Sequence, residues 1–156
     1  MLKILINKNP ILRKTSDNLE KITAKDKQFF KQMLDLMYEK KGIGLAAVQV
    51  GILKRVITID IGQGPIVLVN PIIIKKRGKK IAMEEGCLSL PNITVKVSRC
   101  AQVVLKAMNV SGENVKFEAT DLLARVLQHE IDHLNGRMII DYLPWPKRIA
   151  LKRQIS

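Results

Sequence analysis

The sequence predicts a single α+β domain over residues 1–156, and three observations favour this class. A length of 156 residues fits one domain with a continuous core. Apolar residues make up 47% and charged residues 26%, which excludes a disordered or fibrous chain. Helical periodicity precedes a strand-rich middle and then returns, unlike the strand–helix alternation of a parallel sheet. We expect an antiparallel, strand-rich middle packed around a central helix, with an N-terminal helix and a short basic C-terminal helix.

The N-terminal helix is predicted over residues 23–41. Thr23 and Asp26 form a start of the capping-box kind. The run Lys-Lys-Gly at residues 40–42 supplies the stop. Between them, apolar side chains recur at three- and four-residue spacing: Phe29, Phe30, Met33, Leu34, Leu36 and Met37.

Short runs rich in Val and Ile are the predicted strands, at residues 55–61, 66–74, 93–97, 102–108 and 114–118. Segments of turn composition separate several of them, at residues 62–65, 75–80 and 111–114. The central helix should then begin at Thr120, with Asp121 in its first turn, and end near residues 135–136. The basic segment over residues 146–156 is the third predicted helix.

The charge balance favours a polyanionic partner. Lys and Arg outnumber Asp and Glu by 27 to 14, which gives a net charge of +13. Aromatic residues make up only 4% of the chain, which argues against a nucleic-acid module that stacks bases on Phe or Tyr. Two basic clusters, at residues 75–80 and 147–153, are either solvated faces, one a hairpin turn and one a terminal helix, or surfaces that dock on RNA.

Cysteine content and hydropathy predict the compartment. Cys87 and Cys100 are too few for a disulfide scaffold, and the N-terminal residues lack the pattern of a secretory leader, so we expect a cytoplasmic protein. The longest apolar stretch, residues 66–74, is interrupted by Asn-Pro and is far shorter than the roughly 20 residues of a membrane helix. We therefore expect no membrane span. The sequence predicts no particular oligomeric state.

The only two histidines lie in His-Glu-Ile-Asp-His at residues 129–133, within the predicted central helix. At this spacing, His129 and His133 project from one helix face, close enough to bind a single metal ion, and Glu130 lies beside them. This is the HExxH arrangement. It predicts a metal site, and the alternative is a pair of ordinary surface or core histidines.

A catalytic metal of this type usually has a third protein ligand. Cys87 is the upstream candidate, because Gly86 and Pro91 bracket a loop around it and a thiolate suits iron, zinc or nickel. Composition alone does not decide whether Cys87 is a metal ligand or a buried inert cysteine. For Cys100 we adopt the inert interpretation.

A third segment, Gly-Ile-Gly-Leu-Ala-Ala-Val-Gln at residues 42–49, follows the first helix. Its small residues permit an extended backbone to pass near a ligand, and Gln49 offers a neutral amide donor. Alternatively, Gly42 and Gly44 simply end the helix and form a turn, and Gln49 is a polar core or surface residue.

Together the three segments resemble the peptide deformylase family. Its signatures GxGLAAxQ, EGCLS and QHExDHL correspond to residues 42–49, 85–89 and 128–134, in the same order and without a substitution at any fixed position. The resemblance extends along most of the chain, from Pro-Ile-Leu-Arg at residues 10–13 to Asp-Tyr-Leu at residues 141–143.

The resemblance implies the removal of the formyl group from formyl-methionine at the N-terminus of nascent peptides, with release of formate. It implies that Cys87, His129 and His133 bind one divalent ion, with Fe(II) expected and Zn(II) or Ni(II) as alternatives. In this scheme Glu130 is the general base and acid, a role suited to a carboxylate beside an activated water. Gln49 and the backbone N–H of Leu88 would meet the charge that develops on the formyl oxygen.

The spacing along the helix also predicts a substrate pocket. Val126 and Leu122 lie one and two turns before the histidines on the same stripe, so they either line a pocket for an unbranched apolar side chain or belong to the ordinary core. Ile43, with Met83 as a further candidate, would lie opposite. An extended substrate would pair with the backbone of Ile43, Gly44 and Leu45, near Gly86 of the EGCLS segment.

Charged residues around the site give two further expectations. A buried Glu85 would need a counter-charge, and Arg99 at the end of the following strand is the partner that we propose. Arg125 lies next to the pocket stripe, and we expect its head group to reach solvent.

Two other functions remain open at this point. A metallopeptidase would share the HExxH chemistry, but the common zinc classes need a Glu or His ligand after the helix and none follows His133. A basic ribosome-associated protein without catalysis is the third possibility. The family resemblance also implies contact between the C-terminal helix and the ribosome.

Overall fold

The computed structural model describes residues 2–155, and in them three α-helices accompany one five-stranded antiparallel sheet. The strand order is β1-β2-β3-β4-β5, so each strand pairs with its neighbours in the chain. The expected α+β class and the antiparallel pairing are therefore confirmed. The strands are β1 (Gly44–Ala46), β2 (Val56–Ile59), β3 (Ile66–Cys87), β4 (Leu90–Met108) and β5 (Asn114–Thr120).

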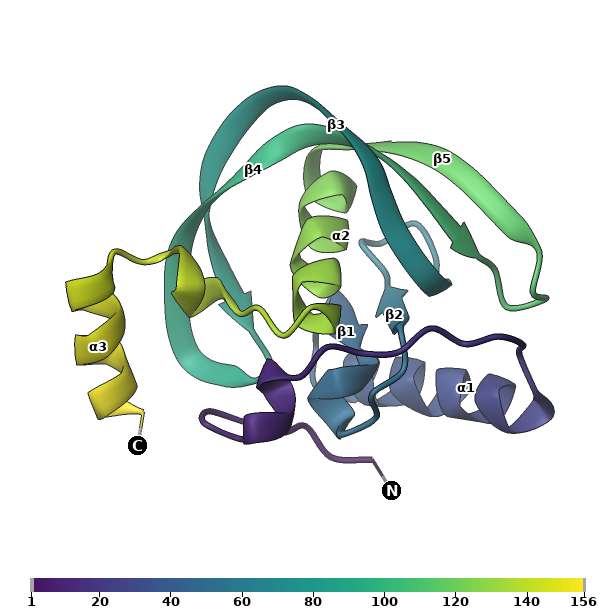
Figure 1. Ribbon diagram of the computed structural model, residues 1–156, viewed down its shortest axis with the longest axis horizontal. Helices are drawn as coiled ribbons and strands as arrows, with labels where there is room; N and C mark the ends of the chain where they lie inside the picture. The colour runs from purple at the N-terminus through teal and green to yellow at the C-terminus, as the bar shows by residue number, and fades with distance from the viewer. Residues whose placement is uncertain (1, 156) are drawn as a thin grey trace.

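The long strands β3 and β4 bend into an arch over the rest of the molecule (Figure 1). This arch contradicts the turn predicted at residues 75–80, because the basic run lies inside β3 and pairs with β4. A register shift between Arg77 and Lys80 accommodates the run, and Gly78 there has a positive φ of 74°. The turn between β3 and β4 comes later, at residues 88–89, inside the loop that Gly86 and Pro91 were expected to bracket.

Several strand boundaries also differ from the expectation. The runs predicted at residues 93–97 and 102–108 are parts of the single strand β4, whereas β1 and the second half of β3 were not predicted. The two hairpin turns predicted at residues 62–65 and 111–114 fall between β2 and β3 and between β4 and β5. Both carry glycines with positive φ, the signal that made these turns predictable.

The first helix, α1 (Ala24–Glu39), starts as predicted. The side chain of Asp26 accepts from the Thr23 N–H at 2.9 Å, and the Asp26 N–H donates to Thr23 Oγ1 at 3.3 Å. Lys54 binds the same carboxylate at 2.6 Å, which connects the helix start to the segment before β2. These hydrogen bonds outweigh burial and lower the pKa of Asp26 from 3.8 to about 2, with the bond from Lys54 as the largest cause.

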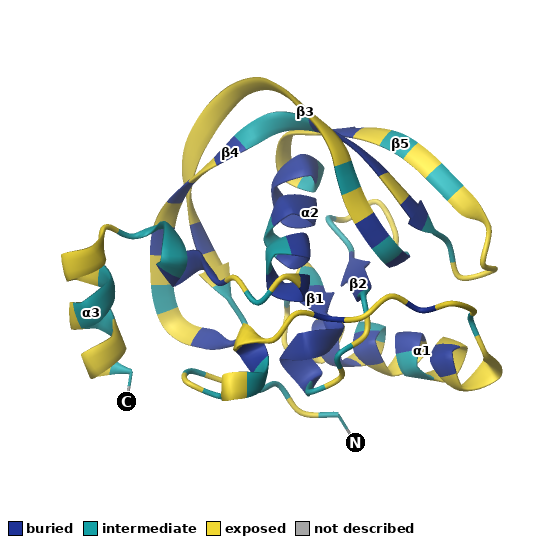
Figure 2. Cartoon of the chain, in the orientation of Figure 1, coloured by how far each residue is buried: buried dark blue, intermediate teal, exposed yellow. Residues whose placement is uncertain are grey.

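The central helix, α2 (Asp121–Leu134), passes beneath the arch, and α3 (Trp145–Gln154) lies at the other end of the molecule from α1 (Figure 1). The apolar side of α2 packs on the sheet through Ala124, Leu127 and Leu134. Most of the helix is buried (Figure 2). Arg125, Gln128, Glu130 and His133 are among its buried residues, so their polar groups need partners inside the protein. None of the helices in residues 2–155 is long and apolar enough to cross a membrane.

Candidate metal and catalytic site

Three potential metal ligands meet where the end of β3 approaches α2. Cys87 Sγ lies 3.3 Å from His133 Nε2, and His133 Nε2 lies 3.2 Å from His129 Nε2. All three ligand atoms lie within 4.8 Å of one another. A tetrahedral site with bonds of about 2.0–2.1 Å to nitrogen and about 2.3 Å to sulfur has edges of about 3.3 and 3.6 Å. The donor set and its spacing therefore fit a tetrahedral metal site with one position left for another ligand.

Glu85 fixes the orientation of His129. Its Oε2 lies 2.9 Å from His129 Nδ1, which leaves Nε2 facing the other two ligand atoms. Arg99 binds the same carboxylate through two hydrogen bonds, at 2.7 and 2.9 Å, so the predicted Glu85–Arg99 pair is confirmed. Burial raises the pKa of Glu85, but the bonds with His129 and Arg99 outweigh it and lower the value to about 2. Glu85 is thus a permanent anion behind the ligand.

Arg125 is a second cation on this carboxylate, and the expectation that its head group reaches solvent is wrong. Its Nη1 donates to Glu85 Oε1 at 2.6 Å and to the carbonyl of Val97 at 3.0 Å. Its Nη2 donates to the carbonyl of Ile81. The physical reason is the arch, whose strands cover the side of α2 that would otherwise face water. Arg125 therefore joins the helix to both long strands.

A second branch of this network runs from Arg99 through Asp132 to Tyr142, in the segment between α2 and α3. Arg99 Nη1 donates to Asp132 at 2.8 Å, and the hydroxyl of Tyr142 donates to the same carboxylate at 2.7 Å. From the sequence alone, Asp132 was open between orienting a neighbour and facing water, and no role was assigned to Tyr142. The available signal was position, because a charged residue on a helix buried on most sides must be paired.

Glu130 is a buried acidic group of the site with an unpaired oxygen among the described residues. It is only 3% exposed, and its Oε2 has no hydrogen-bond partner. Burial raises the pKa of Glu130 from 4.5 to about 7, close to the value that suits a proton shuttle at neutral pH. Space for this carboxylate depends on β1, because a Cβ atom at Gly44 would lie 2.3 Å from Oε1.

The electrostatics of the two imidazoles differ. Burial lowers the pKa of His129, but interactions with Cys87 and Glu85 outweigh burial and raise it to about 10. The pKa of His133 falls well below 6.5, first through burial and then through the charge of His129. Positive charge is therefore favoured on His129 itself, and a neutral ring, the form that binds metals, is favoured at His133.

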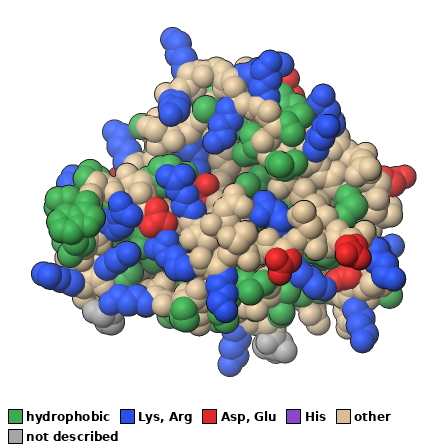
Figure 3. Space-filling view, viewed as in Figure 1, with side chains coloured by type: hydrophobic (Ala, Val, Ile, Leu, Met, Phe, Trp, Pro, Cys, Tyr) green, Lys and Arg blue, Asp and Glu red, His purple; other side chains and the backbone are tan. Residues whose placement is uncertain are grey.

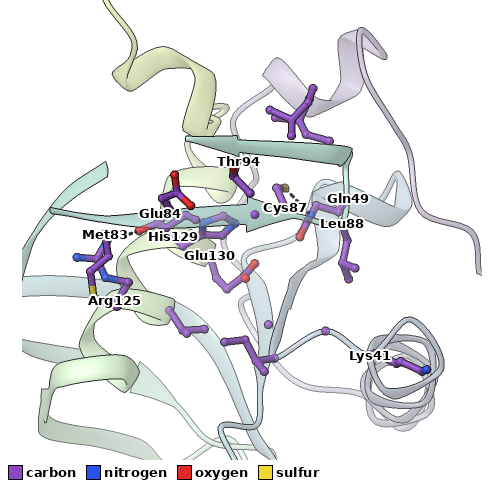
Figure 4. A pocket seen from close by; sticks show the side chains of 18 of the residues that line it. Lys41, Gln49, Met83, Glu84, Cys87, Leu88, Thr94, Arg125, His129 and Glu130 are labelled. Atoms are coloured by element: carbon purple, nitrogen blue, oxygen red, sulfur yellow. Dashed lines mark hydrogen bonds and ion pairs between the residues drawn. The ribbon is translucent and has the colours of Figure 1, made fainter. Parts of the chain in front are cut away.

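Gln49 and Leu88 lie on the opposite side of the same site. The Gln49 amide is 1% exposed, and its Oε1 accepts from the Ala46 N–H at 2.8 Å. This bond turns Nε2 toward Ser89 Oγ at 3.1 Å and Cys87 Sγ at 3.6 Å. Leu88 begins the two-residue turn that follows Cys87. Gln49, Cys87, His129 and Glu130 point toward one another in Figure 4.

These residues open into a cavity of about 510 Å³ between β1, the end of β3 and α2. Of the predicted substrate-binding residues, Ile43, Gly44, Gly86, Leu122 and Val126 line it, together with Met83. Leu45 does not line it, because its side chain is fully buried in the core against α1. Within residues 2–155 the backbone of β1 pairs with β2 alone, which leaves its other edge open to an extended chain. Cys100 lies apart from the three ligand atoms, half-buried beside Gln128.

Comparisons with known proteins agree with one another. The family model described as "Polypeptide deformylase" matches residues 1–148. A peptide deformylase of Clostridium botulinum is 50% identical over 131 residues, which cover 84% of this chain and 88% of that protein. The crystal structure of the Thermotoga maritima peptide deformylase superposes with a TM-score of 0.90 at 40% identity and covers 92% of this chain and 98% of that one. The Synechococcus elongatus peptide deformylase, crystallised with actinonin, gives a TM-score of 0.92 at 36% identity, with 98% and 84% covered.

Proposed function

This chain belongs to the peptide deformylase family of enzymes, and from that premise we propose that it hydrolyses the N-formyl group of nascent formyl-methionyl peptides at the site around Cys87, His129 and His133. One observation carries the proposal: the three ligand atoms converge beside a buried carboxylate that has an unpaired oxygen. Because nascent peptides are made on ribosomes, the proposed reaction belongs to the cytoplasm. We also propose that residues 1–156 act as one catalytic domain.

Cys87, His129 and His133 would hold one divalent cation, with Fe(II) as the expected ion and Zn(II) or Ni(II) as alternatives. Such an ion, when bound, lowers the pKa of water and polarises a carbonyl group. Glu85 would keep His129 in the tautomer that presents Nε2, and it would also balance the positive charge of the site.

Glu130 would accept a proton from the attacking water and return it to the departing amine. Its raised pKa suits both steps, because a group with a pKa near 7 gives and takes protons at neutral pH. Negative charge that develops on the formyl oxygen would be met by Gln49 Nε2 and the backbone N–H of Leu88. The loss of one such donor typically lowers the rate by about 100- to 1,000-fold.

The substrate would enter between the free edge of β1 and the end of β3. Val126 lies at the buried floor of the cavity, and the half-exposed Leu122, Ile43 and Met83 form its apolar rim. This arrangement suits a long unbranched side chain such as that of methionine. The peptide backbone would pair with Ile43, Gly44 and Leu45, and Gly86 leaves room for it because no atom lies within 4 Å of a Cβ built there.

Contact with the ribosome is a separate part of the proposal, and α3 is its candidate surface. None of the residues of α3 is buried, and the helix carries Lys147, Arg148, Lys152 and Arg153. Trp145, at its start, is 70% exposed. Large exposed aromatic side chains beside cations are typical of contact surfaces.

The reaction is tested by comparing the native protein with Glu130→Gln. Each is purified without oxygen, its bound metal is measured, and formate release is followed with formyl-Met-Ala-Ser. We expect the variant to keep its metal and to lose at least 100-fold in kcat, because only the proton acceptor is changed. An unformylated peptide is incubated in parallel. Its internal cleavage would indicate a peptidase, and full formate release by the variant would remove Glu130 from the mechanism.

A further inference from the structure

A second cavity, of about 980 Å³, lies on the other side of α2. Its walls are the segment at residues 16–18, the inner side of the arch in β3 and β4, and the C-terminal half of α2. It shares no lining residue with the catalytic cavity. Its volume is at the upper end of the range of about 300–1,000 Å³ for ligand pockets, and it exceeds the space that a single phosphate needs.

Cations dominate the lining of this second cavity. Five are present, namely Arg55, Lys76, Lys80, Arg99 and Arg137, against the two acids Asp17 and Asp132. Arg99 and Asp132 neutralise each other at 2.8 Å within the network behind His129. Four cations and one acid therefore remain. Figure 3 shows the wider setting, a face on which Lys and Arg side chains greatly outnumber Asp and Glu.

The two arginines that remain have no carboxylate partner among residues 2–155. Arg55 is half-buried and, among the described residues, donates to neutral oxygens alone: Asn135 Oδ1 at 2.9 Å and the carbonyls of Pro71 at 3.3 Å and Leu134 at 3.4 Å. Arg137 stacks on the ring of Tyr142 at 4.2 Å. Ser16, also in the lining, has a buried hydroxyl oxygen with no hydrogen-bond partner in the described part of the chain. Arg137 is exposed, but Arg55 is half-buried, and a partly desolvated cation without a counter-charge is costly. A bound anion would lower that cost.

We propose that this second cavity binds the phosphate groups of a nucleic-acid strand. Guanidinium groups match phosphate oxygens in a planar, bidentate geometry. The cations come from three separate segments, with Lys76 and Lys80 on β3, Arg55 just before β2 and Arg137 just after α2, so several phosphates are accommodated rather than one. The only aromatic ring in the lining, Tyr142, is covered by Arg137, which leaves no platform for base stacking. Binding is therefore to the backbone and independent of base sequence. The inference does not depend on the proposed deformylation.

A pair of double variants tests this site with equal changes of charge. Lys76→Gln/Lys80→Gln removes two cations from the cavity wall, whereas Lys75→Gln/Lys79→Gln removes two from the same strand that do not line it. The probe is a single-stranded RNA 12-mer of mixed sequence, measured by fluorescence anisotropy at several salt concentrations. Loss of two phosphate contacts is expected to reduce the salt slope by about 1.4, which corresponds to about 25-fold weaker binding at 0.1 M salt. The control pair is expected to change affinity by less than about threefold.

Three results would overturn the proposal. The first is no RNA binding by the native protein at 0.1 M salt, and the second is an equal loss of affinity in both double variants. The third is that polyglutamate or inorganic phosphate displaces the labelled RNA as effectively as unlabelled RNA does at matched charge. This result would exclude a nucleic-acid strand as the specific ligand. Formate release is measured on the same samples. Neither Lys76 nor Lys80 lines the catalytic cavity, so deformylase activity and RNA binding are separable outcomes.

Discussion

The substitution Gly44→Ala is expected to displace the proposed base without altering the ligand set. The added methyl carbon would lie 2.3 Å from Oε1 and 2.9 Å from Cδ of Glu130, whereas ordinary contact begins near 3.4 Å. The carboxylate must therefore retreat by about 1 Å. A misplacement of this size costs roughly 100-fold in rate, so we expect kcat to fall by about that factor, or about 2.7 kcal/mol in activation free energy.

The assay is formate release at saturating formyl-Met-Ala-Ser, with bound metal measured on the same sample. Gly86→Ala is the matched control, because Gly86 lines the same cavity and a Cβ there meets nothing within 4 Å. A methyl group at this position points into substrate space, so KM is free to rise while kcat stays within a few fold of native. The reasoning fails if Gly44→Ala keeps its kcat, or if its activity falls only in proportion to lost metal.

Three further predictions concern stability and specificity. Asp26→Asn should lower the free energy of unfolding by about 1–2 kcal/mol at pH 7, a value reduced because Lys54 is half-exposed. Because the folded pKa of Asp26 lies below its unfolded value of 3.8, this difference should be constant above about pH 5 and vanish toward pH 2 in urea titrations. Arg125→Met should lower the free energy of unfolding by about 3 kcal/mol in the same titrations, because Glu85 keeps only one arginine partner and two carbonyl groups lose their donor. A loss below about 1 kcal/mol would refute the buried pairing. Val126→Phe should raise KM at least tenfold for formyl-Met peptides but less for formyl-Ala peptides, and an equal effect on both would exclude Val126 from the side-chain pocket.

The predictable part of the site is the part encoded over short distances. His129, Glu130 and His133 share one helix, and helical spacing alone brings the two imidazoles onto one face. The start of α1 was equally predictable, because Thr23 and Asp26 are three residues apart and satisfy each other's backbone groups. The position of Cys87 could not be predicted from spacing alone, because its approach to the helix depends on where β3 ends.

The remainder depends on long-range packing that local patterns do not encode. The basic run at residues 75–80 has the composition of a turn, but pairing with β4 on one side keeps it in a strand. The same long strand then covers Arg125, which would be exposed on an isolated helix. The two errors have one origin, because both follow from not foreseeing the arch.

The position of the three ligand atoms gives the proposed metal a mechanical role as well. Cys87 and His133 stand 46 positions apart in the chain, one at the tip of a hairpin and the other on a helix. An ion that joins them would restrict the unfolded chain as a covalent cross-link does. A cross-link that closes a loop of that length stabilises the folded state by about 4 kcal/mol through lost chain entropy. Chelation should therefore loosen the hairpin tip first, and proteases should cut there before they reach the rest of the sheet.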